Sequence, residues 1–216
     1  MPPAAWLSAP SAPPTGTLLL RHGMTRMTVE KRYAGTSDAP LNDAGLEQAA
    51  AAAKRLATAG LDAIVSSPLR RARATASEVA ALCGLPVAVD EGFRETDFGD
   101  WEGLTFAEVR EQWPDVLTAW LADPEAGPPG GESFAAAGKR IDAAMERVLA
   151  AHAGQKVLIV SHVGPIKALV ASALQAPPSA IFRMHLDIAA LSSIDWHADG
   201  RAVLRSYNDT AHLRQP

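Results

Sequence analysis

Two histidines stand in equivalent places along the 216-residue chain, each two residues beyond the end of a short apolar run. Residues 17–20 precede His22, and residues 157–160 precede His162. Arg21 stands directly before the first histidine. An imidazole can act as a nucleophile, as an acid or base, or as a metal ligand, and a guanidinium binds phosphate oxygens through a fixed fork of N–H donors. The set predicts either phosphoryl chemistry or a metal site.

The elements that must position these groups alternate between short apolar runs and helical patterns. The expected strands are residues 17–20, 61–65, 86–89 and 157–160. The expected helices are residues 43–58 with Asn42 as the cap before them, 68–83 with Ser67 as N-cap, 105–121 with a break near Pro114, 134–149 and 165–174. Residues 190–196 and 202–207 lack a helix between them and are expected to add antiparallel edge strands. This alternation predicts an α/β fold, a three-layer α/β/α sandwich with a mostly parallel sheet.

Three strand ends bring candidate groups to one edge of the expected sheet. In open parallel sheets the ligand site lies beyond the carboxyl ends of the strands, and neighbouring strands lie about 4.8 Å apart. If the first and fourth strands are adjacent, His22 and His162 share a pocket with Arg21 and with an arginine that follows the second strand. Arginines repel a metal ion, and no third carboxylate or thiolate ligand is spaced with the histidines. We expect the pocket to bind a phosphoryl group, and we expect no metal or cofactor.

Four ordered motifs carry a family resemblance that extends over roughly residues 17–210. They are Arg21-His22-Gly23, residues 66–72 (SSPLRRA), residues 94–103 (RETDFGDWEG) and Ser161-His162. Together they resemble the histidine phosphatase superfamily, which has the phosphoglycerate-mutase-like fold. The resemblance implies a metal-independent phosphatase that passes through a phosphohistidine intermediate.

The resemblance also implies a role for each matching residue. His22 matches the nucleophile, and Arg21, Arg71 and His162 match a clamp on the phosphate oxygens. Glu95 matches the acid that protonates the leaving oxygen and then activates water. The pattern selects Arg71 over its neighbour Arg70, which is expected at the rim or surface. Arg94 is expected to be a structural ion-pair partner.

Substrate identity is less defined, because Met24 and Thr28 stand where many family members have Glu and Asn. The short span of residues 95–128 leaves little room for a lid and favours hydrolysis over phosphoglycerate mutation. Within the hydrolases the chain most resembles bacterial acid phosphatases and α-ribazole phosphatases, with a small phosphorylated metabolite as substrate. The alternatives are a phosphoglycerate mutase and a non-catalytic module that binds a phosphorylated ligand. Candidate substrate contacts are Thr28, Tyr33, Trp101, Glu132 and His185.

Composition sets the remaining expectations. The length suits one domain, expected at residues 17–216, and a net charge of −4 provides no global attraction to nucleic acid or to an anionic membrane. Five prolines in residues 1–16 predict a disordered tail or a linker, which an upstream ribonuclease H domain could precede as in some similar proteins. No run of 18 apolar residues occurs, and a cytoplasmic location is expected.

Overall fold

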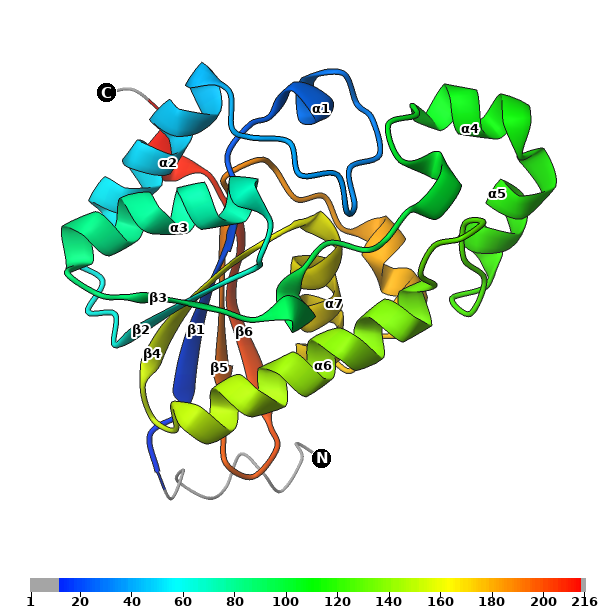
Figure 1. The fold of residues 1–216 in the computed structure, drawn as a ribbon. Helices are drawn as coiled ribbons and strands as arrows, with labels where there is room; N and C mark the ends of the chain where they lie inside the picture. The colour runs from blue at the N-terminus through cyan, green and yellow to red at the C-terminus, as the bar shows by residue number, and fades with distance from the viewer. Residues whose placement is uncertain (1–11, 215–216) are drawn as a thin grey trace.

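A single mixed sheet forms the centre of the computed structural model, which describes residues 12–214. Within this range the sheet has six strands in the order β3-β2-β4-β1-β5-β6 (Figure 1). The strands are β1 (Thr15–Arg21), β2 (Ala63–Ser66), β3 (Val87–Val89), β4 (Lys156–Ser161), β5 (Leu191–Trp196) and β6 (Ala202–Asp209). β1 to β4 pair in parallel, whereas β5 and β6 pair antiparallel. The expected mostly parallel sheet with two antiparallel edge strands is confirmed.

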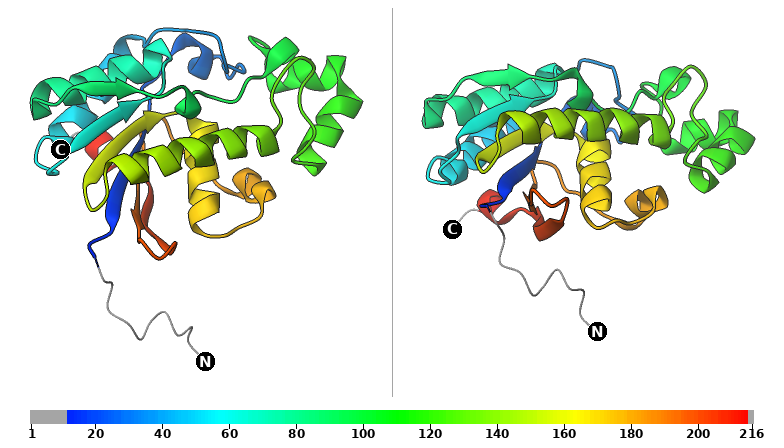
Figure 2. Two further views of the ribbon diagram at one scale, coloured as in Figure 1. Left: turned by 60° about the horizontal axis from the view of Figure 1, so that its bottom comes forward. Right: turned by 90° about the horizontal axis from the view of Figure 1, so that it is seen from below.

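Helices cover both faces of the sheet, which gives the expected three layers (Figure 2). α2 (Asp43–Leu56) and α3 (Arg70–Cys83) pack on one face, and α6 (Phe134–Ala151) and α7 (Val163–Ala173) pack on the other. Neighbouring residues of a strand point to opposite faces, so a strand covered on both sides is apolar throughout. Leu19 and Leu20 of β1 are both fully buried, one in each core cluster. The unbroken apolar runs in the sequence are therefore explained by burial on both faces.

Two further helices, α4 (Phe106–Gln112) and α5 (Pro114–Ala122), lie beyond the sheet and project from the rest of the fold (Figures 1 and 2). Pro114 occupies the first turn of α5, where its missing N–H leaves no helical hydrogen bond unmade. The predicted break near Pro114 is therefore confirmed. A small core of their own holds these helices, and it contains Trp101, Val109, Leu117 and Trp120.

Short elements complete the described chain. They are α1 (Arg26–Val29) and the 3₁₀ turns η2 (Glu91–Phe93), η3 (Gly99–Trp101), η4 (Pro178–Arg183) and η5 (Ala211–Leu213). None of the helices in residues 12–214 is long and apolar enough to cross a membrane.

Several element boundaries differ from those expected, and three of the differences concern the expected tail or the site. β1 begins at Thr15, so the expected tail is wrong for residues 15 and 16, and residues 1–11 lie outside the described part. α3 begins at Arg70 rather than Pro68, because Asp38 from a distant loop accepts the hydrogen bond of the Arg70 amide at 2.6 Å. Ser67 is therefore not the N-cap. α7 begins at Val163, which places His162 itself at the N-cap position.

Candidate active site

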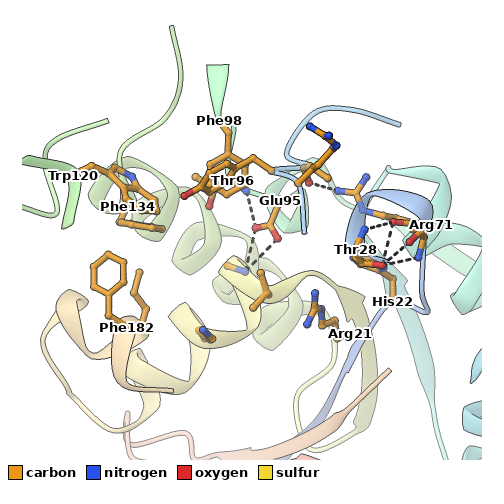
Figure 3. Close-up of a pocket in the computed structure, with 18 residues that line it drawn as sticks. Arg21, His22, Thr28, Arg71, Glu95, Thr96, Phe98, Trp120, Phe134 and Phe182 are labelled. Atoms are coloured by element: carbon orange, nitrogen blue, oxygen red, sulfur yellow. Dashed lines mark hydrogen bonds between the residues drawn. The ribbon is translucent and has the colours of Figure 1, made fainter. Parts of the chain in front are cut away.

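A pocket of about 300 Å³ contains the end of β1 and the first turn of α7 in its lining. The register pairs Arg21 with Ser161, and the amide of His22 donates to the Ser161 carbonyl at 3.0 Å. The first and fourth strands are thus adjacent, which is the condition under which His22 and His162 were expected to share a pocket. Polar groups line one part of the pocket and aromatic rings line another (Figure 3). The polar and charged lining residues are Arg21, His22, Thr25, Thr28, Arg32, Arg71, Glu95, Thr96 and Lys167.

His22 is held as a neutral imidazole in one tautomer. The residue is 4% exposed, and its ring Nδ1 lies 2.7 Å from the carbonyl oxygen of Gly23, which can only accept a hydrogen bond. Nδ1 must therefore carry the proton, and Nε2 keeps its lone pair. Burial, followed by the positive charges of Arg71 and Arg21, lowers the pKa of His22 well below its ordinary value. The lone pair on Nε2 is the feature that a nucleophile requires.

Arg71 and His162 form a buried pair behind the nucleophile. Arg71 is 1% exposed and His162 is fully buried. Arg71 Nε donates to His162 Nδ1 at 3.2 Å, so the other ring nitrogen, Nε2, donates to Ser67 Oγ at 2.6 Å. The His162 ring centroid lies 5.0 Å from that of His22. Burial and the nearby charge of Arg71 lower the pKa of His162 well below its ordinary value, which keeps this ring neutral too.

Arg21 supplies unused donors to the same space. Its Nη1 donates to the Leu186 carbonyl at 2.6 Å, and its buried Nε has no hydrogen-bond partner within the described residues. Burial lowers the pKa of Arg21, and the charge of Arg71 adds to this, but a guanidinium keeps its proton under all ordinary conditions. An unsatisfied buried N–H beside a neutral imidazole is suited to bind an anionic oxygen.

Glu95 enters the pocket from the segment that follows η2. The residue is 4% exposed, and its carboxyl accepts hydrogen bonds from the amides of Thr96 at 2.9 Å and Gly164 at 3.1 Å (Figure 3). Burial raises the pKa of Glu95, whereas these amides and the two arginines partly oppose the shift. A carboxyl with a raised pKa can carry a proton to a leaving group, as a general acid must.

Aromatic side chains form another part of the lining, and three of them, Trp120, Phe134 and Phe182, lie away from Arg21 and Arg71 (Figure 3). Phe134 lies with its ring centroid 4.7 Å from that of Trp120 and 5.3 Å from that of Phe182. Tyr33 and Phe98 form a second pair, with centroids 4.8 Å apart. All five residues line the pocket. This aromatic wall, defined by these five residues, offers flat apolar surface to whatever group is attached to the phosphate.

The sequence profile of the histidine phosphatase superfamily (branch 1) matches residues 17–210. The chain belongs to this superfamily. A bifunctional protein of Mycobacterium tuberculosis is 46% identical over 201 residues, which are 93% of this chain and 55% of that protein. The chain thus spans about half the length of this relative. A phosphoglycerate mutase candidate of Yersinia enterocolitica is 37% identical over 92% of this chain and 94% of its own length.

Solved structures of phosphatases share the fold of this chain. A mycobacterial glucosyl-3-phosphoglycerate phosphatase superposes with a TM-score of 0.84 at 33% identity, covering 91% of this chain and 100% of that chain. An α-ribazole-5′-phosphate phosphatase candidate from Escherichia coli superposes with a TM-score of 0.83 at 30% identity. The match covers 91% of this chain and 97% of that chain. These neighbours support a phosphatase activity.

Two of the candidate substrate contacts line the pocket, and a third does not. Thr28 and Tyr33 are part of the lining. Thr28 Oγ1 is already engaged, because it donates to the carbonyl of Thr25 and accepts from its amide within a capping box at the start of α1. Trp101 is fully buried in the core of α4 and α5, so its expected contact with substrate is wrong.

Glu132 and His185 also lie outside the pocket lining. Glu132 accepts two hydrogen bonds from Arg140 and lies 3.6 Å from Arg94, which confirms Arg94 as a structural ion-pair partner. The His185 side chain is 81% exposed and bonds to Asp187. Both expectations rested on nearness to a motif in sequence, which does not fix the direction of a loop side chain.

Sequence reasoning missed three polar residues at the site. Ser67 contacts His162, and Arg32 and Lys167 line the pocket. Lys167 makes no hydrogen bond or ion pair with any described residue, and burial together with the charge of Arg21 lowers its pKa. The sequence held a signal for Lys167, because residues three apart share a helix face. Lys167 follows by that spacing Gly164, which lines the pocket. Within residues 12–214 no group of three or more His, Cys, Asp or Glu side chains is arranged to hold a metal ion.

Proposed function

We propose that the chain is a phosphomonoesterase of the acid phosphatase or α-ribazole-5′-phosphate phosphatase type, and that it works through a phosphohistidine on His22. One observation carries the proposal. Buried His22 is fixed as the tautomer with a free lone pair on Nε2, and it shares the pocket with Arg21, Arg71 and Glu95. A nucleophile, a cationic phosphate site and a proton donor are the groups that phosphoryl transfer requires.

In the first step His22 Nε2 bonds to phosphorus while the ester P–O bond breaks in line. Glu95 gives its proton to the leaving oxygen, so the alcohol departs neutral and Glu95 becomes a carboxylate. Arg21, through its unpartnered Nε, and Arg71 stabilise the charge on the non-bridging oxygens. Four hydrogen bonds of Arg71 go to other protein groups, and one of the five guanidinium N–H groups remains for phosphate.

In the second step water replaces the alcohol. The Glu95 carboxylate takes a proton from water, the water oxygen bonds to phosphorus, and the bond from phosphorus to His22 Nε2 breaks. Inorganic phosphate leaves, Glu95 is protonated again, and His22 returns to its neutral form. The same carboxyl thus serves as acid and then as base, which requires a pKa near the working pH; its burial shifts the pKa in that direction.

The aromatic wall supports an aromatic leaving group. Flat rings stack on or meet aromatic side chains edge to face, with centroids about 4.5–7 Å apart. α-Ribazole 5′-phosphate carries a benzimidazole base on its sugar phosphate, and the pocket places Trp120, Phe134 and Phe182 away from the arginines. This arrangement favours the α-ribazole or aryl phosphate class over small polar esters such as phosphoglycerate.

The test compares products from three substrates: α-ribazole 5′-phosphate, 1-naphthyl phosphate and 3-phosphoglycerate. We expect phosphate release with a preference for the two aromatic esters, and we expect His22→Ala to abolish turnover while it still binds inorganic phosphate. Conversion of 3-phosphoglycerate to an isomer would support a mutase instead. Binding of the esters by the unmodified chain with no turnover would support a non-catalytic module.

The wider setting is also proposed rather than observed. We infer that residues 17–216 form the catalytic domain, that its substrate is a small phosphorylated metabolite, and that it works in the cytoplasm without contacting nucleic acid itself. The M. tuberculosis relative is named bifunctional and is nearly twice as long as the matched region, which supports a second domain such as a ribonuclease H unit in the natural protein. Sequencing of the gene upstream of Met1, and ribonuclease assays on its full product, would test this.

A further inference from the structure

The loop at residues 34–38 lies between the carboxylate of Glu102 and the buried guanidinium of Arg71. Glu102, the residue that directly follows η3, accepts hydrogen bonds from the amides of Gly35 at 2.8 Å and Thr36 at 2.9 Å. It also accepts from the amide and the hydroxyl of Ser37. One half-buried carboxylate therefore holds three successive amides of this loop.

Arg71 binds the other side of the same loop. Its Nη2 donates to the carbonyls of Ala34 at 2.8 Å and Gly35 at 3.1 Å, and its Nη1 donates to the carbonyl of Ser37 at 2.6 Å. The Ala34 carbonyl and the Gly35 amide belong to one peptide group, and the Gly35 carbonyl and the Thr36 amide belong to the next. Two consecutive peptide groups thus stand between Glu102 and Arg71, with each N–H toward the carboxylate and each C=O toward the guanidinium.

The loop is fixed against the segment that carries the acid. A Cβ at Gly35 would overlap the Thr96 carbonyl oxygen and Glu102 Oε1, so only glycine fits this approach. The Asp38 carboxylate accepts from the amide of Arg70, the first residue of α3. The loop therefore contacts both the segment next to Glu95 and the helix that carries Arg71.

We propose that Glu102 is a positioning residue for phosphate binding, which acts on Arg71 through the two peptide groups between them. This inference rests on the proposed function of the pocket. The carboxylate stabilises the orientation in which the peptide dipoles meet the guanidinium with their oxygen ends. That orientation fixes Nη1 and Nη2, and through Nε it fixes His162, so the remaining N–H of Arg71 is aimed at the phosphate.

Removal of the Glu102 charge should weaken phosphate binding and leave proton transfer intact. In Glu102→Gln the side-chain NH₂ cannot accept, so part of the loop loses its partner and its carbonyls are free to turn away from Arg71. A displacement of about 1 Å in a positioning group can reduce activity by on the order of 100-fold. Because Glu95 is untouched, the dependence of rate on the leaving group should stay as in the natural sequence.

The experiment measures kcat, KM and the inhibition constant of vanadate for nitrophenyl phosphate hydrolysis. We expect Glu102→Gln to raise the vanadate constant on the order of 10-fold or more. Asp62→Asn is the matched control, because Asp62 also binds a backbone amide, that of Lys156, but at the amino end of β4. Melting temperatures of both variants show how much of any change is loss of fold stability.

A double-mutant cycle with Arg71→Lys shows whether Glu102 affects vanadate binding through Arg71. If Glu102 acts through Arg71, Glu102→Gln should change the vanadate constant of the Arg71→Lys variant by no more than about 2-fold. Additive effects, or a Glu102→Gln variant that matches the Asp62→Asn control, would overturn the inference. An unmodified chain with no phosphatase activity would instead refute the proposed function, so the two failures are distinguishable.

Discussion

Glu95→Gln tests the chemistry of the pocket with little disturbance of its shape. The Glu95 carboxyl accepts hydrogen bonds from the amides of Thr96 and Gly164. Glutamine has nearly the same volume, and its carbonyl oxygen can accept from both amides. The substitution therefore keeps the packing of a group that is 4% exposed and removes only its ability to give or take a proton.

The magnitude follows from the role and from the leaving group. General acid catalysis contributes about 10²–10⁴ in rate, which corresponds to about 3–5 kcal/mol of barrier. An alkyl alkoxide leaves poorly, so an alkyl phosphate should lose most of this factor in the first step. A nitrophenolate leaves with little protonation, so phosphorylation of His22 by nitrophenyl phosphate should be partly spared. Slow attack by water should then let the phosphoenzyme accumulate in Glu95→Gln.

Rapid-quench labelling with radioactive nitrophenyl phosphate provides the assay. We expect an acid-labile, base-stable label on the Glu95→Gln protein, and no label when His22→Ala is added. Glu132→Gln is the matched control, since Glu132 is a partly buried carboxylate that bonds to Arg140 outside the pocket lining. Equal slowing of alkyl and nitrophenyl substrates, with no labelled protein, would show that Glu95 is not the proton donor.

Further predictions concern pH, ligands, the leaving group and stability. Activity on alkyl phosphates needs neutral His22, whose pKa is lowered, and protonated Glu95, whose pKa is raised. The value of kcat/KM should therefore rise with pH as His22 loses its proton and fall as Glu95 loses its proton. Vanadate should inhibit, and exhaustive chelation should not, because Arg21 and Arg71 supply the positive charge; loss of activity on chelation with recovery on addition of one divalent metal would contradict this. Phe182→Ala should raise KM for naphthyl phosphate several-fold but leave methyl phosphate unchanged, since an aromatic contact contributes about 0.5–1.5 kcal/mol. Glu95→Gln should be more stable than the natural chain above neutral pH, by on the order of 1 kcal/mol in urea titrations, because the folded state then no longer buries a carboxylate; equal stability would refute the burial argument.

The sheet and the catalytic strand ends could be predicted from sequence because their signals are local. A strand covered on both faces reads as an unbroken apolar run, and such runs end two residues before His22 and before His162. The rule that parallel strands end at one edge then brings both imidazoles together without any knowledge of the loops. The adjacency of β1 and β4 confirms that step.

The rest of the pocket could not be read from the sequence, because it depends on contacts between distant segments. Trp120, Phe134 and Phe182 come from α5, α6 and η4, and no spacing relates them. The start of α3 is set by Asp38, which is 32 residues away from the amide that it binds. Ser67, in a sequence typical of an N-cap, accepts from the nearby amide of Leu69 at 3.3 Å but also binds His162, which is 95 residues away, at 2.6 Å. In each case a contact with a distant segment decides the arrangement.

Burial affects the two titrating groups of the site in opposite directions, and the proposed reaction uses both shifts. Desolvation and the arginines act together on His22, because both disfavour its protonated form. At Glu95 they oppose each other, and desolvation is the larger effect. A phosphate dianion that binds to Arg21 and Arg71 would offset their charge at Glu95 and so raise the pKa of this carboxyl further. Substrate binding itself therefore favours the protonated acid that the first step needs, and departure of phosphate reverses the effect after the second.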